Sequence, residues 1–518
     1  MESRESLKGR IDWLTTLIPF VGVAALCAVF MVAPDSSKTV LEAIRMFIGD
    51  DCGIYYAILG VGVFGLTIWT AFSKKYGNVK LGGAEKPQYN NFLWGAMIFT
   101  SALAADIMFY SLSEWAMYAS DAHVKSMGSM QDWAPTFPLF HWGPIAWCFH
   151  MMLAICFGFM VHVRKRDRQR FSEACRPIFK DKMDGNLGRI IDIIAILAML
   201  AGIATTFSLA TPLLSAAICK VFGLSDSITL TISILILIAV IYTLAVWFGM
   251  KGISKMAKWC MYFFFAFLAY VFFLGGEARY ILETGFQSMG NMVQNFIGLS
   301  TWLDPLRETS FPQNWTLFYW AYWMAWTIGT PFFIGMISKG RTIKNTILGG
   351  YGWALAGTFT SFIILGNYGL AQQMKHGLDV VGLIDGGGTY YEAILQILGT
   401  LPMPSIALLL LVVTMIMFYS TSFDTLTLIA SIYSYKRMGD NEEPHKAIRG
   451  LWAVMFILFP IGLLFSENSM YGLQSVSIIA AFPIGIIIMI MIWAFFKDVD
   501  LFLENEQNNG FCANDENQ

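Results

Sequence analysis

The residues best suited to chemistry in this chain are aromatic. Residues 315–326 hold four tryptophans and two tyrosines within one apolar segment. Trp320, Trp323 and Trp326 recur every three residues, so they share a broad stripe of a helix. Membrane proteins usually place Trp and Tyr at the ends of a span, but here the rings continue to its middle. Ring faces there can attract an ammonium group, while packing between helices is the alternative interpretation.

A second aromatic cluster lies in another apolar segment. Residues 141–147 include Trp142 and Trp147, and they are followed by His150. Two facing aromatic clusters can enclose a quaternary or tertiary ammonium group, because such a cation offers few hydrogen-bond donors. A neutral imidazole at His150 can join such a cage, whereas a protonated one would repel a cation. A hydrogen-bonded structural histidine is the other possibility.

Asp106 is a carboxylate in the middle of an apolar segment. Placing such a group at the centre of a span costs about 2.5–3.5 kcal/mol on insertion scales, so it marks a functional site by default. It could pair with a cationic substrate. The alternatives are a hydrogen bond to a neighbouring polar group and the carriage of a proton.

The composition predicts the elements that position these residues. Of 518 residues, 56% are hydrophobic and only 14% are charged, which is typical of an all-α polytopic membrane protein. Hydropathy predicts twelve transmembrane helices, near 13–33, 53–73, 92–117, 137–163, 190–213, 228–249, 256–275, 315–337, 346–371, 404–434, 450–466 and 474–496.

Loop charges orient these spans. The loops that follow even-numbered spans are rich in Lys and Arg, and one of them contains the basic run 164–170. The long loop 276–314, which follows the seventh span, carries several acidic residues. The positive-inside rule then places both termini in the cytoplasm. We interpret the basic run as a topology signal and lipid contact. The predicted divisions are an N-terminal segment 1–12, a twelve-helix domain 13–497 and a short acidic tail 498–518, which we expect to be disordered at its end.

Helix-weakening residues fall in particular spans. The fourth contains Gly143 and Pro144, the eighth contains Gly329 and Pro331, and the tenth has a polar stretch at 419–424. Irregular backbone at membrane depth must line a cavity or be buried in protein. The third and eighth spans are five apart, which suits inverted repeats of spans 3–7 and 8–12. Residues 280–300 and 390–400 are amphipathic and predict helices along the membrane surface.

The sequence lacks the motifs that are typical of several other classes of protein. The eight cysteines show no metal spacing or disulfide framework, and the six histidines form no HExxH pattern. No Walker motif is present, so we expect neither an enzyme nor an ATP-driven pump. The net charge of −2 says nothing about nucleic acid, and we expect no nucleic-acid partner. A channel remains an alternative to a carrier, and saturable uptake would separate them.

Four ordered motifs resemble the betaine–choline–carnitine transporter family. The most specific is Phe318-Tyr-Trp-Ala-Tyr-Trp-Met-Ala-Trp326, followed by Ser338-Lys-Gly-Arg341. The others are Phe140-His-Trp-Gly143 with Trp147, Met108-Phe-Tyr110 with Glu114, and Thr421-Ser-Phe-Asp424. The likeness extends from about residue 10 to residue 497.

The resemblance implies an architecture and a substrate site. It implies a LeuT-like core in spans 3–12, a homotrimer held partly by the amphipathic helix before span 8, and a bacterial cytoplasmic membrane as the location. The substrates would be trimethylammonium compounds. The aromatic box would map to Trp142, Trp147, His150 and Trp323.

The same resemblance assigns flanking positions. Trp326 would lie along the exit route and Trp320 near an outer or flanking site, while Tyr322 replaces a usual Trp. Family carriers of zwitterions tend to have glycine where this chain has Asp106, and choline-type carriers have aspartate. We therefore predict uptake of choline or trimethylamine, with a carrier or exchanger of betaine or carnitine as the alternative.

The coupling ion is less determined by sequence. Thr421 and Ser422 match hydroxyls that bind sodium in sodium-coupled relatives, so Na⁺ is a predicted coupling ion and no other cofactor is expected. Hydroxyls in spans also commonly bond their own preceding carbonyls. Coupling to protons, for instance through Asp106, remains the alternative.

Overall fold

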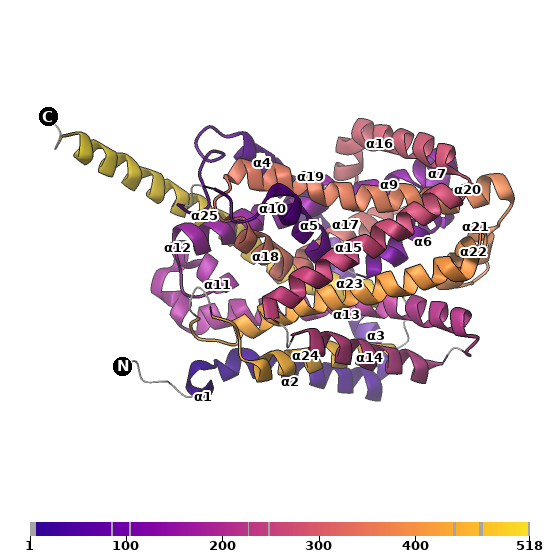
Figure 1. The fold of residues 1–518 in the computed structure, drawn as a ribbon, viewed down its shortest axis with the longest axis horizontal. Helices are drawn as coiled ribbons and strands as arrows, with labels where there is room; N and C mark the ends of the chain where they lie inside the picture. The colour runs from indigo at the N-terminus through magenta and orange to yellow at the C-terminus, as the bar shows by residue number, and fades with distance from the viewer. Residues whose placement is uncertain are drawn as a thin grey trace.

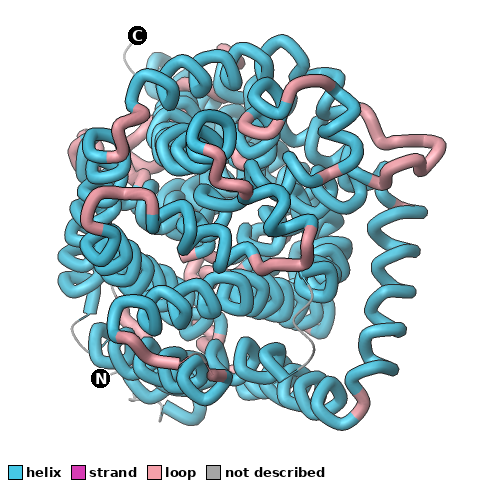
Figure 2. Tube along the Cα trace, turned by 90° about the vertical axis from the view of Figure 1, so that its right-hand side faces the viewer, coloured by secondary structure: helices cyan, strands magenta, loops and turns pink. Residues whose placement is uncertain are grey.

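A computed structural model describes residues 7–83, 86–102, 105–225, 227–246, 249–438, 442–465 and 470–515 (Figure 1). Within these ranges the chain is helical, and Figure 2 shows helices joined by loops, with no strand drawn in the described part. The helices that form the predicted spans are α2 (Trp13–Val32), α4 (Gly53–Phe72), α5 (Asn91–Ala102), α6 (Asp106–Ser120), α9 (Thr136–His141), α10 (Pro144–Gly158), α13 (Asn186–Phe222), α14 (Ile228–Val246), α15 (Gly249–Leu274), α17 (Leu317–Ala325), α18 (Thr330–Ile337), α19 (Ile343–Ser361), α20 (Asn367–His376), α23 (Pro404–Tyr433), α24 (Lys446–Phe465) and α25 (Met470–Asp515).

Each predicted span falls on one of these helices or on consecutive ones. By length and apolar composition, six helical stretches of the described residues can cross a membrane, or seven if a bent pair counts as one span. The all-α membrane class is therefore confirmed, while the number twelve stays a prediction.

Interrupted helices appear where the sequence predicted them in the fourth and eighth spans. α9 ends at His141 and α10 begins at Pro144, with Gly143 between the two helices. The eighth span is divided into a π-helical turn, Pro312–Thr316 (η4), then α17, a 3₁₀ turn and α18. Pro144 and Pro331 lack a backbone N–H and would clash with a preceding helical turn, so each lies in the first turn of a new helix. In the third span, α5 ends at Ala102 and α6 begins at Asp106, and residues 103 and 104 between them lie outside the described part.

The tenth span differs from the expectation of a weakened helix. α23 continues without interruption through the polar stretch 419–424. The hydroxyl of Ser420 donates to the Ile416 carbonyl at 2.8 Å, and that of Thr421 donates to the Met417 carbonyl at 3.0 Å. These hydroxyls are satisfied by the preceding turn of their own helix, so the polar residues do not break it.

Both amphipathic segments are helices, α16 (Ala278–Thr301) and α22 (Tyr390–Gly399). α16 turns by 112° from the preceding helix, as expected of a helix that leaves a span to follow the membrane surface. One face of α16 is buried and the other exposes a row of apolar side chains, Leu282, Phe286, Met289, Val293 and Ile297.

The described part of the acidic tail is helical, and the expectation of disorder at its end falls on residues outside that part. α25 runs past the predicted boundary at 497 to Asp515, and Figure 1 shows it projecting from the body; residues 516–518 lie outside the described part. Val499 is buried, and the Phe502 ring lies 5.7 Å from the Phe159 ring. The apolar residues at 499 and 502 share a helical face and anchor the first turns of the tail.

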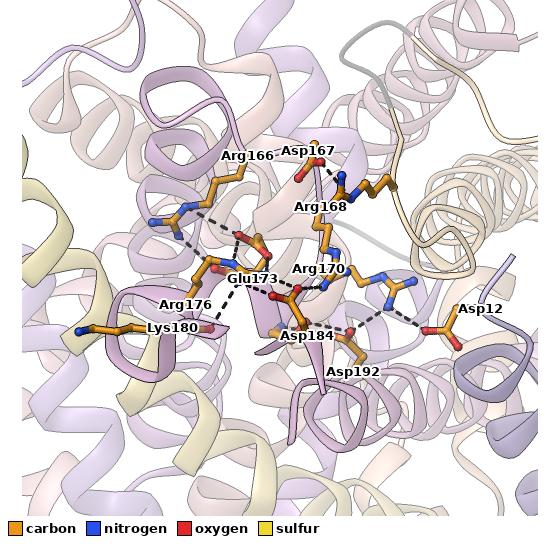
Figure 3. A network of polar contacts seen from close by, with 12 residues as sticks. Asp12, Arg166, Asp167, Arg168, Arg170, Glu173, Arg176, Lys180, Asp184 and Asp192 are labelled. Atoms are coloured by element: carbon orange, nitrogen blue, oxygen red, sulfur yellow. Dashed lines mark hydrogen bonds and ion pairs between the residues drawn. The ribbon is translucent and has the colours of Figure 1, made fainter. Parts of the chain in front are cut away.

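The basic run 164–170 is engaged within the protein (Figure 3). Arg170 donates to Asp192 at 3.2 Å, approaches Asp12 at 3.4 Å and bonds the Tyr435 carbonyl. The other arginines of the run pair with carboxylates as well, Arg164 and Arg166 with Asp498 and Arg168 with Asp184. Carboxylates of the chain thus bind these four arginines and link α2, α13 and α25, while the interpretation of the run as a topology signal and lipid contact stays a prediction.

Candidate substrate site

Trp323 is the ring that three predicted box residues share. Its centroid lies 5.6 Å from Trp142, 4.7 Å from Trp147 and 4.9 Å from His150. The ring planes meet at 81°, 60° and 81°, respectively. Rings at such angles can line adjacent sides of a binding site. Edge-to-face packing between the rings has the same geometry. The structure thus brings together the four residues predicted for the box.

Local sequence explains how α9 and α10 supply three of these rings. Gly143 and Pro144 stop α9 and start α10, so Trp142 lies at the junction. Trp147 and His150 are three apart on α10 and therefore share its face. Trp323 comes from α17, which packs against α10.

Several buried polar atoms of these four residues have no hydrogen-bond partner in the part of the chain that the structure describes. They are Trp147 Nε1, Trp323 Nε1 and His150 Nδ1. Leaving such a group unpaired costs about 1–3 kcal/mol, so native structures usually satisfy it. Unsatisfied donors on three neighbouring rings are typical of a site that receives a ligand or ordered water.

Asp106 is the first residue of α6 and is buried. The Tyr322 hydroxyl donates to its Oδ2, and the Thr206 hydroxyl lies 3.3 Å from the same oxygen. The structure records no ion pair between Asp106 and a Lys or Arg of the described residues. Tyr322 is thus a partner of this carboxylate, contributed by the same helix as Trp323.

Trp320 and Trp326 lie apart from the four rings of the box. Trp320 is fully buried and packs on Gly60 of α4, with Phe140 at 6.4 Å. Trp326 is partly buried beside Gly202 of α13. Within the described part of the chain, neither makes a ring contact with Trp323.

Glu114 is a site residue that sequence reasoning noted only as part of a motif. It is fully buried on α6 and accepts a hydrogen bond from Trp142 Nε1 at 2.8 Å. On the same helix, the Tyr110 ring contacts Trp142 at 5.4 Å. A second carboxylate two turns after Asp106 was the signal that could have revealed it.

Thr421 and Ser422 lie on α23, which packs against α5. Ser422 Oγ is buried without a partner, whereas Thr421 bonds its own helix. The described residues contain no cluster of three or more His, Cys, Asp or Glu side chains that could hold a metal. Any sodium ligands here would be hydroxyl and carbonyl oxygens, which are ligands that Na⁺ binds in transporters.

A family model for betaine/carnitine/choline family transporters matches residues 14–501. The chain belongs to this family. It is therefore a multi-pass membrane transporter for substrates of the betaine, carnitine or choline type, in a family of transporters and not of enzymes.

Three of the relatives that this chain resembles are bacterial transporters. The chain is 26% identical to the glycine betaine transporter OpuD of Bacillus subtilis, covering 94% of each chain. It is 29% identical to a probable glycine betaine transporter of Desulfitobacterium hafniense, over 90% of this chain and 92% of that one. Identity to a carnitine transporter of Acinetobacter baumannii is 25%, over 83% and 78%.

A solved structure shows the shared fold. The substrate-bound, outward-open structure of a Na⁺-coupled sialic acid symporter superposes with a TM-score of 0.50 at 14% identity, covering 85% of this chain and 86% of that one. The similarity confirms the predicted LeuT-like fold.

Proposed function

We propose that this transporter takes up a small trimethylammonium-type cation, choline or trimethylamine. The observation that supports this choice is the aromatic box around Trp323 beside α6, whose buried Asp106 has hydroxyl partners and no ion pair within the described residues. Each well-placed ring contributes about 0.5–2 kcal/mol to binding a cation. Three or four rings together with the Asp106 charge support micromolar to millimolar affinity, which corresponds to about 4–8 kcal/mol.

A carrier of zwitterionic betaine or carnitine is the second candidate. The unpartnered N–H groups of Trp147 and Trp323 favour it, because they could donate to a substrate carboxylate. Two of the relatives above are named for glycine betaine and one for carnitine. Against it, a carboxylate near Asp106 would meet like charge in a poorly solvated site.

The remaining features of the proposal concern coupling and assembly. Transport would be coupled to Na⁺ or H⁺, with Thr421 and Ser422 as sodium ligands in the first case. The exposed apolar face of α16 supports a homotrimer, since such faces mark contacts with protein or lipid. The location would be the bacterial inner membrane, with both termini cytoplasmic.

Competition binding on the purified protein tests the substrate class. Choline and trimethylamine should displace a labelled cation more strongly than betaine or carnitine. Asp106→Gly should weaken cation binding and relax the exclusion of zwitterions, because it removes the charge that distinguishes them. If betaine outcompetes both cations on the parent protein, the cation assignment is wrong.

A further inference from the structure

A continuous line of hydrogen bonds leads away from the box through buried side chains. Glu114 accepts from Trp142 Nε1 at 2.8 Å through one oxygen and from the Tyr118 hydroxyl at 2.5 Å through the other. The Tyr118 hydroxyl also lies 2.5 Å from His141 Nδ1. His141 Nε2 lies 2.9 Å from the Thr316 hydroxyl.

Three separate elements build this chain of contacts. Glu114 and Tyr118 are one turn apart on α6, His141 is the last residue of α9, and Thr316 ends η4. All four side chains are at most 4% exposed. The line therefore connects a box tryptophan to the turn that precedes α17, without passing through bulk solvent.

The titratable groups that face Glu114 carry no fixed positive charge. They are Tyr110, Tyr118 and the more distant Asp106 on α6, His141 on α9 and Tyr319 on α17, whose ring stacks on His141 at 5.0 Å. On the other helices packed against α6, Lys125 pairs with Asp385, Lys375 and His376 pair with Glu277, and Asp192 pairs with Arg170, while Lys220 at the far end of α13 is exposed. The tyrosines of those helices also point to other partners, Tyr351 to the Pro144 carbonyl, Tyr368 to Thr400 and Tyr390 to the Phe109 ring.

Two arrangements of protons satisfy every contact in the line. With Glu114 ionised, Thr316 donates to His141 Nε2, His141 Nδ1–H donates to Tyr118, and Tyr118 donates to the carboxylate. With Glu114 protonated, each bond reverses: Glu114 donates to Tyr118, Tyr118 to His141 Nδ1, and His141 Nε2–H to Thr316. A hydroxyl and a neutral imidazole can each serve in either direction.

These arrangements are related by a balanced proton transfer. A proton arriving at His141 Nε2 releases the Nδ1 proton to the Tyr118 oxygen, and the proton that Tyr118 held passes to Glu114. The imidazole and the phenol end neutral, and the only net change is that Glu114 gains one proton. No heavy atom has to move by more than a hydrogen-bond adjustment.

We propose that Glu114 is a proton-binding site, filled through Thr316, His141 and Tyr118, whose proton competes with the cationic substrate. Its charge is coupled to the box because Trp142 donates to the carboxylate while its ring faces Trp323 at 5.6 Å. An anionic acceptor makes the indole face more attractive to a cation, and neutralising it removes that gain. The inference rests on the proposed function, since it needs a cation in the box.

Linkage gives this competition a measurable form. If substrate binds better to ionised Glu114, binding must release a proton, and substrate must lower proton affinity by the same factor. Affinity for choline should fall as the pH falls, by at most tenfold per pH unit for one proton. Titration calorimetry of the purified full chain with choline, from about pH 5 to about pH 9 in two buffers of different ionisation enthalpy, counts the protons released.

Glu114→Gln is the decisive variant, because its amide can donate to Tyr118 and accept from Trp142 as protonated Glu114 does. We expect weaker choline binding that no longer varies with pH and no proton release. Asp106→Asn is the matched control at the other buried carboxylate of α6: its binding should weaken while proton release persists.

Tyr118→Phe keeps the carboxylate and interrupts the line, so it provides a second readout if Glu114→Gln does not fold. Losing that donor favours protonated Glu114, and the fall in choline affinity should begin at a higher pH. Parent protein that binds choline equally at every pH without proton release would overturn the inference while leaving the proposed function intact. Persistent release in Glu114→Gln would also overturn it. A parent that binds no cation would instead contradict the proposed function.

Discussion

The hydroxyl of Tyr322 donates a hydrogen bond to Oδ2 of Asp106. Thr206 on α13 contacts the same oxygen at 3.3 Å, so three helices meet at one carboxylate. Both hydroxyls stabilise the ionised form, because a carboxylate only accepts. Tyr322 therefore supports the carboxylate on which the proposed cation selectivity rests.

Tyr322→Phe should weaken both folding and cation binding. The ring remains, but a buried carboxylate loses a donor, which costs about 1–3 kcal/mol. We expect a lower melting temperature in detergent and roughly tenfold weaker choline binding, by the conversion of about 1.4 kcal/mol per tenfold. Tyr110→Phe is the matched control, since the described residues show no hydrogen bond between the Tyr110 hydroxyl and Asp106. Equal effects of the two variants would contradict a special role for the Tyr322 hydroxyl.

Trp323→Ala should abolish most saturable uptake, because it removes the ring that Trp142, Trp147 and His150 share. Trp323→Phe should retain part of the affinity, since it keeps a smaller ring face. Trp320→Phe serves as the control on the same helix, because Trp320 packs on α4. Uptake of labelled choline into proteoliposomes measures all three, and affinity within twofold of the parent for Trp323→Ala would refute the box.

The double variant Thr421→Ala, Ser422→Ala tests sodium coupling. If these hydroxyls bind Na⁺, the sodium concentration for half-maximal uptake should rise at least several-fold while the melting temperature changes little. Ser420→Ala is a neighbouring control whose hydroxyl is bonded to the Ile416 carbonyl. A parent protein with no response to sodium would shift the coupling to protons or to exchange.

Arg170→Ala should destabilise the fold strongly. It leaves Asp192, which is 1% exposed, without its ion-pair partner, and an uncompensated buried charge costs about 3–5 kcal/mol. The matched change Arg168→Ala removes a pair with the half-exposed Asp184 and should cost about 1 kcal/mol or less. Thermal unfolding of both variants in detergent makes the comparison, and similar losses would show that burial does not decide the strength of this cluster.

Local sequence determined where the spans lie and where two of them are interrupted. Long apolar runs must be helical in a bilayer because their backbone groups find no water, and Gly143-Pro144 and Gly329 with Pro331 end helices through their own backbone geometry. The four rings that meet around Trp323 were assigned to a box through the resemblance of their motifs to a known family. These features depend on a few neighbouring residues, so they can be read along the chain.

Only the tertiary structure decided which polar groups meet. Asp106 bonds Tyr322 and Thr206, which are 216 and 100 residues away in the chain, and Glu114 joins Trp142 across two helices. The polar stretch 419–424 suggested a break, but Ser420 and Thr421 bond the preceding turn of their own helix. The tail is helical beyond residue 497, where Phe502 packs on Phe159. Such partners follow from how helices pack against each other, and hydropathy and motif spacing carry no information about that packing.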